Sequence, residues 1–398
     1  MKQRAETPHI AIVGKRNAGK SSLINFLTGQ DIAIVSPHAG TTTDPVKKTM
    51  EIKGIGPIVW IDTAGIDDIG SIGTMRIQKS LEALKTVDLA LILFSENTLS
   101  EYDISLVELC KLHKIPFILI HSKSDIQKLD KSVLNNLKEE FQVEVLDANI
   151  HNEASKDELI SLIQKLLPES SHKHRSLLGD VLKPESIVLL VTPIDSSAPE
   201  GRLILPQVQT IRDILDNDSM VLVCKEHQLK SFLTKINPKP DLVITDSQVF
   251  GLVNKIVPQE IPLTSFSILL ARSKGFFDEY VQGTQSIASL NDNDRILILE
   301  SCTHHASCED IGRVKLPQLL RNFTQKELQI DIVPGLSPIQ RPIQDYALVI
   351  QCGGCVVTKK QLESRLQPAL DAHIPVSNYG MAIAYMTGIF ERSVAIFT

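Results

Sequence analysis

The chain has 398 residues, of which 43% are hydrophobic and 22% charged, and its formal net charge is −6. This length exceeds what one hydrophobic core usually organises, and no low-complexity tract or short repeat indicates disorder, so we expect two or three folded domains. The acidic balance argues against broad binding of nucleic acid. No apolar run approaches the roughly 20 residues that cross a bilayer, and no signal-peptide core precedes the first apolar segment. We therefore expect a soluble, cytoplasmic protein with no nucleic-acid or membrane partner.

Apolar runs alternate with helix-length segments from residue 9 to about residue 167. The runs expected to form strands are HIAIV, PIVWID, VDLALILF and IPFILI. This alternation predicts an α/β fold with a doubly wound sheet. A polar stretch at 168–173 follows the last helical segment and is expected to be a linker. We therefore place a first domain at 1–170.

Two smaller α/β domains with parallel sheets are expected after it. The second, at 171–263, has strand-like runs at 186–192, 220–224 and 241–245, with helical patterns at 206–215 and 248–255. It carries no phosphate loop and no cluster of titratable residues at strand ends, which favours a role in dimerisation. From about residue 264 a long helical pattern leads to the runs RILILE, QIDIV, YALVIQ and PVSN. These predict a third domain at 264–398.

Residues 14–21, GKRNAGKS, match the pattern G-x-x-x-x-G-K-[ST] between a predicted strand and a predicted helix. The glycines let backbone N–H groups surround phosphate oxygens, and the helix N-terminus adds a positive dipole. Lys20 is expected to neutralise the β and γ phosphates, and Ser21 to bind magnesium. A chance glycine-rich turn is the weaker interpretation, because pattern, strand and helix coincide.

Two loops between this motif and residue 70 are expected on the phosphate side. In the segment DTAG, Asp62 can hold magnesium through water and the Gly65 amide can meet the γ-phosphate. The segment GTTTD resembles the GTTxD pattern of translation-factor-like GTPases, which makes Thr42 the expected second magnesium hydroxyl and Thr43 the second choice. A solvated turn is the competing interpretation of the threonines.

The base-recognition element is expected after the run IPFILI, where HSKSD resembles NKxD with Ser122 in place of asparagine. A carboxylate at Asp125 pairs with the two donors on the guanine edge and rejects adenine, so it selects GTP over ATP. A helix N-cap role for Asp125 is the alternative. The full set of expected nucleotide-binding residues is Gly14, Asn17, Ala18, Gly19, Lys20, Ser21, Ser22, Ser122, Lys123 and Asp125, and the expected catalytic set is Lys20, Thr42, Asp62 and Gly65.

Two residues bear on the rate of GTP hydrolysis. Ile66 stands where Ras-type GTPases carry a water-orienting glutamine, and an alkyl chain cannot align a nucleophile, so slow intrinsic turnover is expected. Asn17 resembles the asparagine of potassium-activated GTPases, where it helps hold a monovalent cation. We therefore expect stimulation by potassium.

Four of the six cysteines follow residue 300. Cys302 and His304 come directly after the run RILILE, and Cys352-Gly-Gly-Cys355 directly after YALVIQ. If these strands are parallel neighbours, the three sulfurs share the carboxyl edge of one sheet, and the two glycines let both thiolates turn inward. A zinc site completed by His304 or Cys308, a redox dithiol and a four-iron cluster all stay open on this pattern. Cys110 and Cys224 are expected to be buried core residues.

The chain as a whole resembles the maturation GTPases of iron-only hydrogenase, the HydF family. That family carries C-x-H, a gap of about fifty residues and H-C-x-x-C around a four-iron cluster, and here the match falls on Cys302, His304, Cys352 and Cys355. Gln351 replaces the second histidine, which leaves the fourth ligand open. The segments ESCTHHASCEDIGRVKLP and APEGRLILPQVQTIRDILD are also similar to the family.

The resemblance implies a cytoplasmic scaffold that uses GTP or GDP, magnesium and potassium. It implies a four-iron four-sulfur cluster on Cys302, Cys352 and Cys355, with His304 as a possible further ligand. A transient diiron precursor of the H-cluster would come from two radical-SAM maturases and pass to apo iron-only hydrogenase, from a homodimer or higher homo-oligomer. The alternative is a GTPase of tRNA modification or ribosome assembly with a structural zinc domain.

Overall fold

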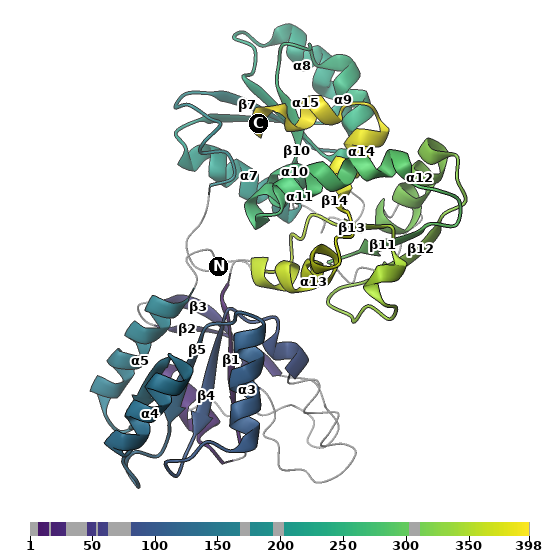
Figure 1. Cartoon of the computed structure of the whole chain (residues 1–398). Helices are drawn as coiled ribbons and strands as arrows, with labels where there is room; N and C mark the ends of the chain where they lie inside the picture. Colours follow the sequence, from purple (N-terminus) through teal and green to yellow (C-terminus); the bar gives the residue numbers. More distant parts are fainter. Residues whose placement is uncertain are drawn as a thin grey trace. The chain divides into compact units, whose positions relative to one another are not determined.

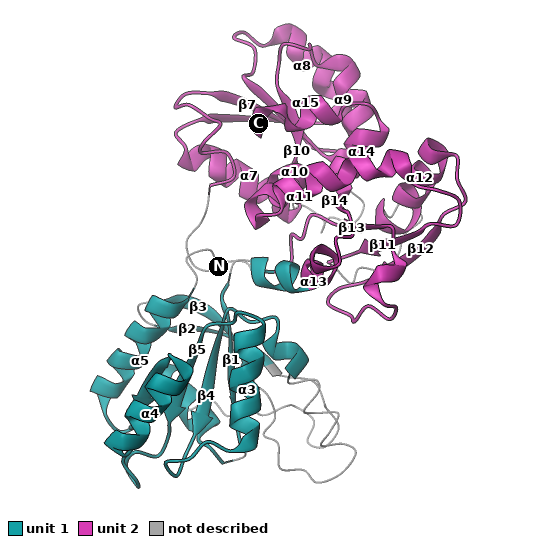
Figure 2. Ribbon diagram, viewed as in Figure 1, with its two compact units in different colours: residues 1–174, 358–364 teal, residues 175–357, 365–398 magenta. Residues whose placement is uncertain are grey.

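The computed structural model describes residues 7–15, 17–28, 46–52, 55–62, 81–167, 176–193, 203–301 and 311–397. The chain forms two compact units, one of residues 1–174 with 358–364 and one of residues 175–357 with 365–398 (Figure 2). The predicted linker at 168–173 lies outside the described residues.

The first unit contains a six-stranded sheet of order β2-β3-β1-β4-β5-β6 (Figure 1). All of its strand pairs are parallel except β2 with β3. Its strands are β1 (His9–Gly14), β2 (Val46–Ile52), β3 (Gly56–Asp62), β4 (Leu89–Phe94), β5 (Phe117–His121) and β6 (Glu144–Asp147). Its helices are α1 (Lys20–Thr28), α3 (Glu101–Leu112), α4 (Lys131–Phe141) and α5 (Glu153–Leu166).

Helices cover both faces of this sheet because successive strand residues point to opposite sides. Ile10 and Ile12 of β1 pack in one core with residues of α1 and α5. Ala11 and Val13 pack in the other core with residues of α3 and α4. The central strands β1, β4 and β5 are buried along their whole length, as expected for parallel strands covered on both faces.

The second unit contains two four-stranded sheets, of order β10-β9-β7-β8 and β12-β11-β13-β14, and every strand pair in both is parallel. The first sheet comprises β7 (Ile187–Val191), β8 (Met220–Cys224), β9 (Leu242–Thr245) and β10 (Leu263–Ser265), with α7 (Leu205–Asp216), α8 (Leu229–Lys235) and α9 (Phe250–Ile256). The second comprises β11 (Arg295–Leu299), β12 (Gln329–Val333), β13 (Leu348–Gln351) and β14 (Val376–Asn378), with α12 (Leu316–Thr324) and α14 (Tyr379–Met386). Helix α15 (Phe390–Val394) contacts β10 of the first sheet. Helix α13 (Lys359–Asp371) is divided between the two units, because residues 358–364 belong to the first.

The long helical pattern predicted from residue 264 forms two helices, α10 (Phe266–Lys274) and α11 (Phe277–Thr284). The first ends at Gly275, whose φ of 94° is a left-handed cap that glycine adopts without a Cβ penalty. Ser267 on α10 donates to Asn378 Oδ1 at 2.9 Å, at the point where α14 begins. Helix α10 therefore contacts the second sheet at the junction of β14 and α14.

The predicted fold class is confirmed: a doubly wound α/β sheet comes first and two parallel α/β sheets follow. Within the described part of the chain, no helix is both long and apolar enough to cross a membrane.

Candidate nucleotide pocket and cysteine site

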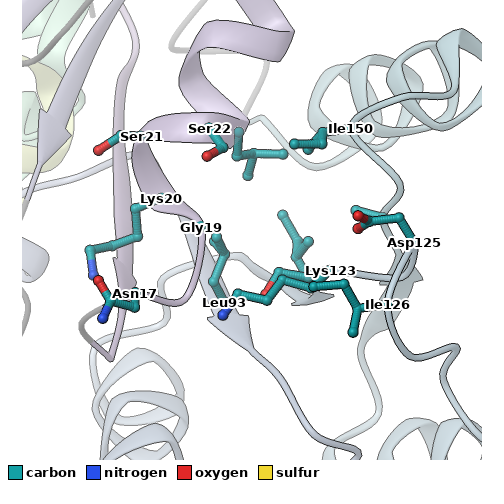
Figure 3. A pocket seen from close by; sticks show the side chains of 14 residues that line it. Asn17, Gly19, Lys20, Ser21, Ser22, Leu93, Lys123, Asp125, Ile126 and Ile150 are labelled. Carbon is teal, nitrogen blue, oxygen red and sulfur yellow. The ribbon is translucent and has the colours of Figure 1, made fainter.

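A pocket of about 410 Å³ opens at the carboxyl ends of β1, β4 and β5, the usual ligand edge of a doubly wound sheet. Its lining includes Asn17 and residues 19–23, which follow β1, and Ser122, Lys123, Asp125 and Ile126, which follow β5. The predicted residues Gly14 and Ala18 belong to the same loop but do not line the pocket. In Figure 3, Asp125 and Ile150 face the pocket from the side opposite Asn17 and Lys20. The structure therefore brings the predicted phosphate loop and the predicted base-recognition loop to one cavity.

The phosphate loop is a strained turn that its glycines permit. Gly14 has φ of 146°, and a Cβ placed on it would lie 2.5 Å from the backbone oxygen of Leu93. Gly19 has φ of 86° and Asn17 has φ of 59°, both in the left-handed region that favours glycine and asparagine. Lys20 Nζ donates to the backbone oxygens of Gly14 at 2.8 Å and of Lys15 at 2.6 Å. The lysine thus lies over the loop, where a phosphate would meet its charge.

On the base side, the loop starts at a buried serine and presents an exposed carboxylate. Ser122 Oγ donates to the backbone oxygen of Phe94 at 3.1 Å, which ties the loop to the end of β4. The nearest atom to a Cβ built on Gly19 is Ser122 Cβ at 3.8 Å, so the serine packs against the phosphate loop. Asp125 lies in a turn and does not cap a helix, because α4 begins at Lys131 with Asp130 as its N-cap. The N-cap interpretation of Asp125 is therefore wrong.

Several predicted residues lie outside the described part of the chain. They include Thr42, Thr43, Gly65 and Ile66. Asp62 ends β3, and its backbone pairs with Ile12 of β1, so the chain leaves the sheet beside the phosphate loop. The Asp62 side chain is outside the described residues.

The sequence prediction missed six residues that line the pocket: Leu23, Leu93, Ile120 and Ile126, and two later in the chain, Ala148 and Ile150. Both follow β6, a four-residue strand, EVLD, which pairs with β5 through His121 and Asp147. The alternation of apolar residues in VEVLDA after α4 could have indicated this strand.

The predicted cysteine edge rests on β11 and β13, which are parallel neighbours with Leu299 opposite Gln351. Ser301, the residue before Cys302, donates its backbone N–H to Cys352 Sγ at 3.0 Å. Its Oγ lies 2.9 Å from the same sulfur. The structure therefore brings the chain that enters Cys302 into contact with Cys352.

Gln351, the residue before Cys352, is completely buried. Its Nε2 is 3.1 Å from Ser301 Oγ and 3.5 Å from Cys352 Sγ. The amide nitrogen is thus a hydrogen-bond donor to the sulfur of Cys352. Among the described residues, its Oε1 is buried without a hydrogen-bond partner.

The second cysteine of the pair lies in a turn with Gly354 at φ of 67°. Burial raises the pKa of the Cys355 thiol to about 11, and the neighbouring Cys352 acts in the same direction. A metal that binds this sulfur must displace the proton, as metals do at thiolate sites.

Burial lowers the pKa of Arg365, whose guanidinium donates to the backbone oxygens of Glu300 and Val333 at the ends of β11 and β12.

Cys302, His304 and Cys308 lie outside the described residues. Among the residues that the structure does describe, no group of three or more His, Cys, Asp or Glu side chains is placed to hold a metal ion. Cys110 and Cys224 are buried, as the sequence predicts.

Protein-family models match most of the chain. The hydrogen maturase F dimerization domain matches residues 177–275, and the hydrogen maturase F tetramerization domain matches residues 278–396. Together these two models cover more than half of the chain. A model described as a 50S ribosome-binding GTPase matches residues 9–123.

Curated relatives match a smaller part of the chain. The tRNA modification GTPase MnmE of Lactobacillus acidophilus is 40% identical over 161 residues, which are 39% of this chain and 33% of that protein. The MnmE of Helicobacter pylori strain J99 is 30% identical over 200 residues, 49% of this chain and 43% of that protein. The chain thus matches less than half the length of these relatives. A crystal structure of an Aquifex aeolicus Era variant has 21% identity and a TM-score of 0.36, over 55% of this chain and 93% of that one.

Proposed function

We propose, from the premise that this chain belongs to the hydrogen maturase F (HydF) family, that it is a GTP-hydrolysing carrier of an iron-sulfur cluster. It would receive the diiron precursor of the H-cluster from two radical-SAM maturases and deliver it to apo iron-only hydrogenase. The proposal divides the chain into a GTPase domain, a dimerisation domain and a cluster-binding domain, and it includes homo-oligomerisation in the cytoplasm.

The nucleotide half of the proposal assigns roles to the pocket residues. Lys20, which already donates to two loop carbonyls, offsets phosphate charge. Asp125 accepts from the guanine edge, and Ser122 fixes the start of its loop. Ser21 and Thr42 would hold magnesium, which when bound offsets further phosphate charge. Asp62 and Gly65 would complete the γ-phosphate side.

The cluster half rests on the donor set at the carboxyl edge of β11 and β13. Cys352 Sγ accepts an N–H bond from Ser301, which favours the thiolate that binds iron. The observation that carries the proposal is this contact, because it joins Ser301, the residue before Cys302, to a cysteine that lies 51 residues later. Cys302, Cys352 and Cys355 would hold the cluster, with His304 as a further candidate. When bound, such a cluster supplies iron with an exchangeable position.

Substitutions in either half test whether the two activities are separable. Lys20→Ala should abolish GTP turnover, because the phosphate charge is left unbalanced, and should leave iron loading unchanged. Cys302→Ser should lower iron content and leave turnover unchanged. Turnover and iron content are measured on the same anaerobic preparations, with Lys165→Ala on the exposed side of α5 as a control. Loss of both activities in either variant would refute the division of roles.

The proposal includes slow turnover that potassium stimulates. Asn17 lines the pocket together with Lys20, and in this proposal its amide oxygen helps to bind the cation. GTP turnover in potassium should exceed turnover in sodium by about tenfold or more, as a supplied positive charge does in related chemistry. Asn17→Ala should remove the difference. Equal rates in both salts for the unaltered protein would count against a cation site.

The alternative function, a tRNA-modification or ribosome-assembly GTPase with a structural zinc domain, is not favoured. MnmE relatives match 39 to 49% of this chain, whereas residues 177–275 and 278–396 match hydrogen maturase F domains. Under the alternative, the purified protein would be colourless and would contain zinc in place of iron.

A further inference from the structure

The segment 122–128, here called the base loop, is held at both ends by one carboxylate that does not line the nucleotide pocket. Asp147 ends β6 and lies opposite His121 in the sheet register. Its Oδ1 is 2.7 Å from His121 Nδ1, directly before the base loop. Its Oδ2 accepts the backbone N–H of Leu129 at 3.3 Å, directly after the loop. One side chain therefore bridges the entry and the exit of the segment that carries Asp125.

A second side chain fixes the same exit from the other direction. Asn97, in the turn after β4, donates from Nδ2 to the backbone oxygen of Lys128 at 3.1 Å. Its Oδ1 accepts the N–H of Asp130 at 2.8 Å. Its φ of 55° is a conformation that asparagine tolerates better than most residues. The exit of the base loop is thus held from β4 and from β6 at once.

Between these ends the loop makes few bonds of its own. The backbone oxygen of Lys123, a residue with φ of 60°, accepts the N–H groups of Ile126 at 2.9 Å and Gln127 at 3.1 Å. Both bonds lie within the loop and do not fix it to the sheet. The attachments at the two ends of the loop, which include the Ser122 bonds to the backbone oxygen of Phe94, fix it to the sheet, so they decide how well the carboxylate of Asp125 is aimed.

The side chain of His121 is buried and held in one orientation by its neighbours. Its side chain is 1% exposed, against 32% for Asp147. Its ring packs against Phe94, with centroids 5.3 Å apart. Its Nε2 is buried and lacks a hydrogen-bond partner among the described residues, so the Nδ1 bond to Asp147 sets the ring orientation.

We propose that Asp147, acting through His121 and Leu129, is a positioning residue that sets guanine affinity and selectivity and does not affect the hydrolytic step. The inference rests on the proposed role of Asp125 in guanine recognition. Guanine differs from hypoxanthine by its 2-amino group, which a well-aimed carboxylate contacts. A loosened base loop should therefore lose preference for guanosine over inosine nucleotides, whereas a change on the phosphate side should weaken both equally.

The test compares dissociation constants for GDP and IDP with kcat and KM for GTP, using the full-length protein. Asp147→Ala should weaken GDP binding on the order of tenfold, the size of one lost bond to a charged group. It should also reduce the GDP-over-IDP preference and raise KM with little change in kcat. Asp147→Asn keeps one acceptor oxygen for two donors. Its GDP affinity and its GDP-over-IDP preference should therefore lie between those of the native protein and of Asp147→Ala. Asp157→Ala removes an exposed carboxylate from α5 and serves as the control.

Should Asp147→Ala fail to fold, Asn97→Ser removes the other attachment of the loop at a solvent-accessible turn, and the same loss of preference is expected. Unchanged GDP-over-IDP preference in folded Asp147→Ala or Asn97→Ser overturns the inference, as does an equal weakening of both nucleotides. Failure of the proposed function looks different: the unaltered protein itself would show no preference for guanine over adenine nucleotides.

Discussion

At the residue scale, the sulfur of Cys352 accepts hydrogen bonds from residues of two different strand ends. The N–H of Ser301 comes from the end of β11, and the amide of Gln351 comes from β13. Both donors depend on the register that places Leu299 opposite Gln351. The sequence pattern could place the cysteines after two strands, but it could not supply that register. For this reason the sequence shows only that Gln351 replaces a histidine of the family pattern, and it does not predict the hydrogen bond from Gln351 to the sulfur.

Replacing Gln351 with leucine should lower the reduction potential of the proposed cluster. Donors to ligand sulfur stabilise the reduced, more negative state, so loss of the amide N–H disfavours reduction. The side chain is fully buried, and leucine has a similar size without the donor. EPR-monitored redox titration of reconstituted protein measures the shift. Gln367→Leu, on an exposed position of α13, is the control, and an unchanged potential at full iron content in Gln351→Leu would contradict the account.

The base loop shows the same limit of sequence reasoning. The motif HSKSD predicted Asp125, and the structure places it in the pocket. The carboxylate of Asp147 contacts His121 and Leu129, which lie 8 positions apart in the chain. Asp147 itself ends β6, a strand that was not among the predicted runs. Such long-range hydrogen bonds follow from sheet order, which a local pattern does not encode.

At the element scale, the two edges of the first sheet in the second unit differ. On β10, Thr264 Oγ1 donates to the backbone oxygen of Ser393 at 2.9 Å, so the C-terminal helix α15 covers this edge. On β8, Met220 and Val223 are 49% and 46% exposed, and within the described residues β7 is its only strand neighbour. An exposed apolar edge strand is a ready template for pairing with another chain. This edge lies inside the match to a dimerization domain.

Val223→Asp should therefore weaken homo-oligomerisation. A charge at an apolar edge must be desolvated in the interface without a partner, which opposes association. Light scattering coupled to size-exclusion chromatography measures the mass over a range of protein concentrations. Leu112→Asp introduces the same charge at an exposed leucine of the first unit and should leave the mass unchanged. The same mass for Val223→Asp and the native protein would exclude β8 from the interface.

Most strands could be predicted from the sequence, including the three-residue β14, but β2, β6 and β10 were not among the predicted runs. β1, β4, β5, β7 and β11 are buried runs that the pattern located. β2, VKKTMEI, carries two adjacent lysines and a glutamate at an antiparallel edge, and β10 has three residues. Both owe their conformation to a neighbouring strand, because their own composition gives little preference for it.

At the scale of the whole molecule, two predicted sites lie in one polypeptide. The phosphate loop and the base loop belong to the first unit, and Cys352 and Cys355 belong to the second. The order of these elements along the chain was predictable, because each motif follows a predicted strand directly. Thr42, Gly65, Cys302 and His304 lie outside the described residues, and their roles stay predictions.

Iron and acid-labile sulfide analysis of anaerobically purified protein, with GTP turnover measured on the same samples, tests the central claim most directly. The native protein should contain iron and sulfide in equal amounts, since a four-iron cluster has one sulfide for each iron. The triple variant Cys302→Ser, Cys352→Ser, Cys355→Ser should lose both and still hydrolyse GTP. Zinc in place of iron in the native protein, or iron and sulfide undiminished in the triple variant, would contradict the account.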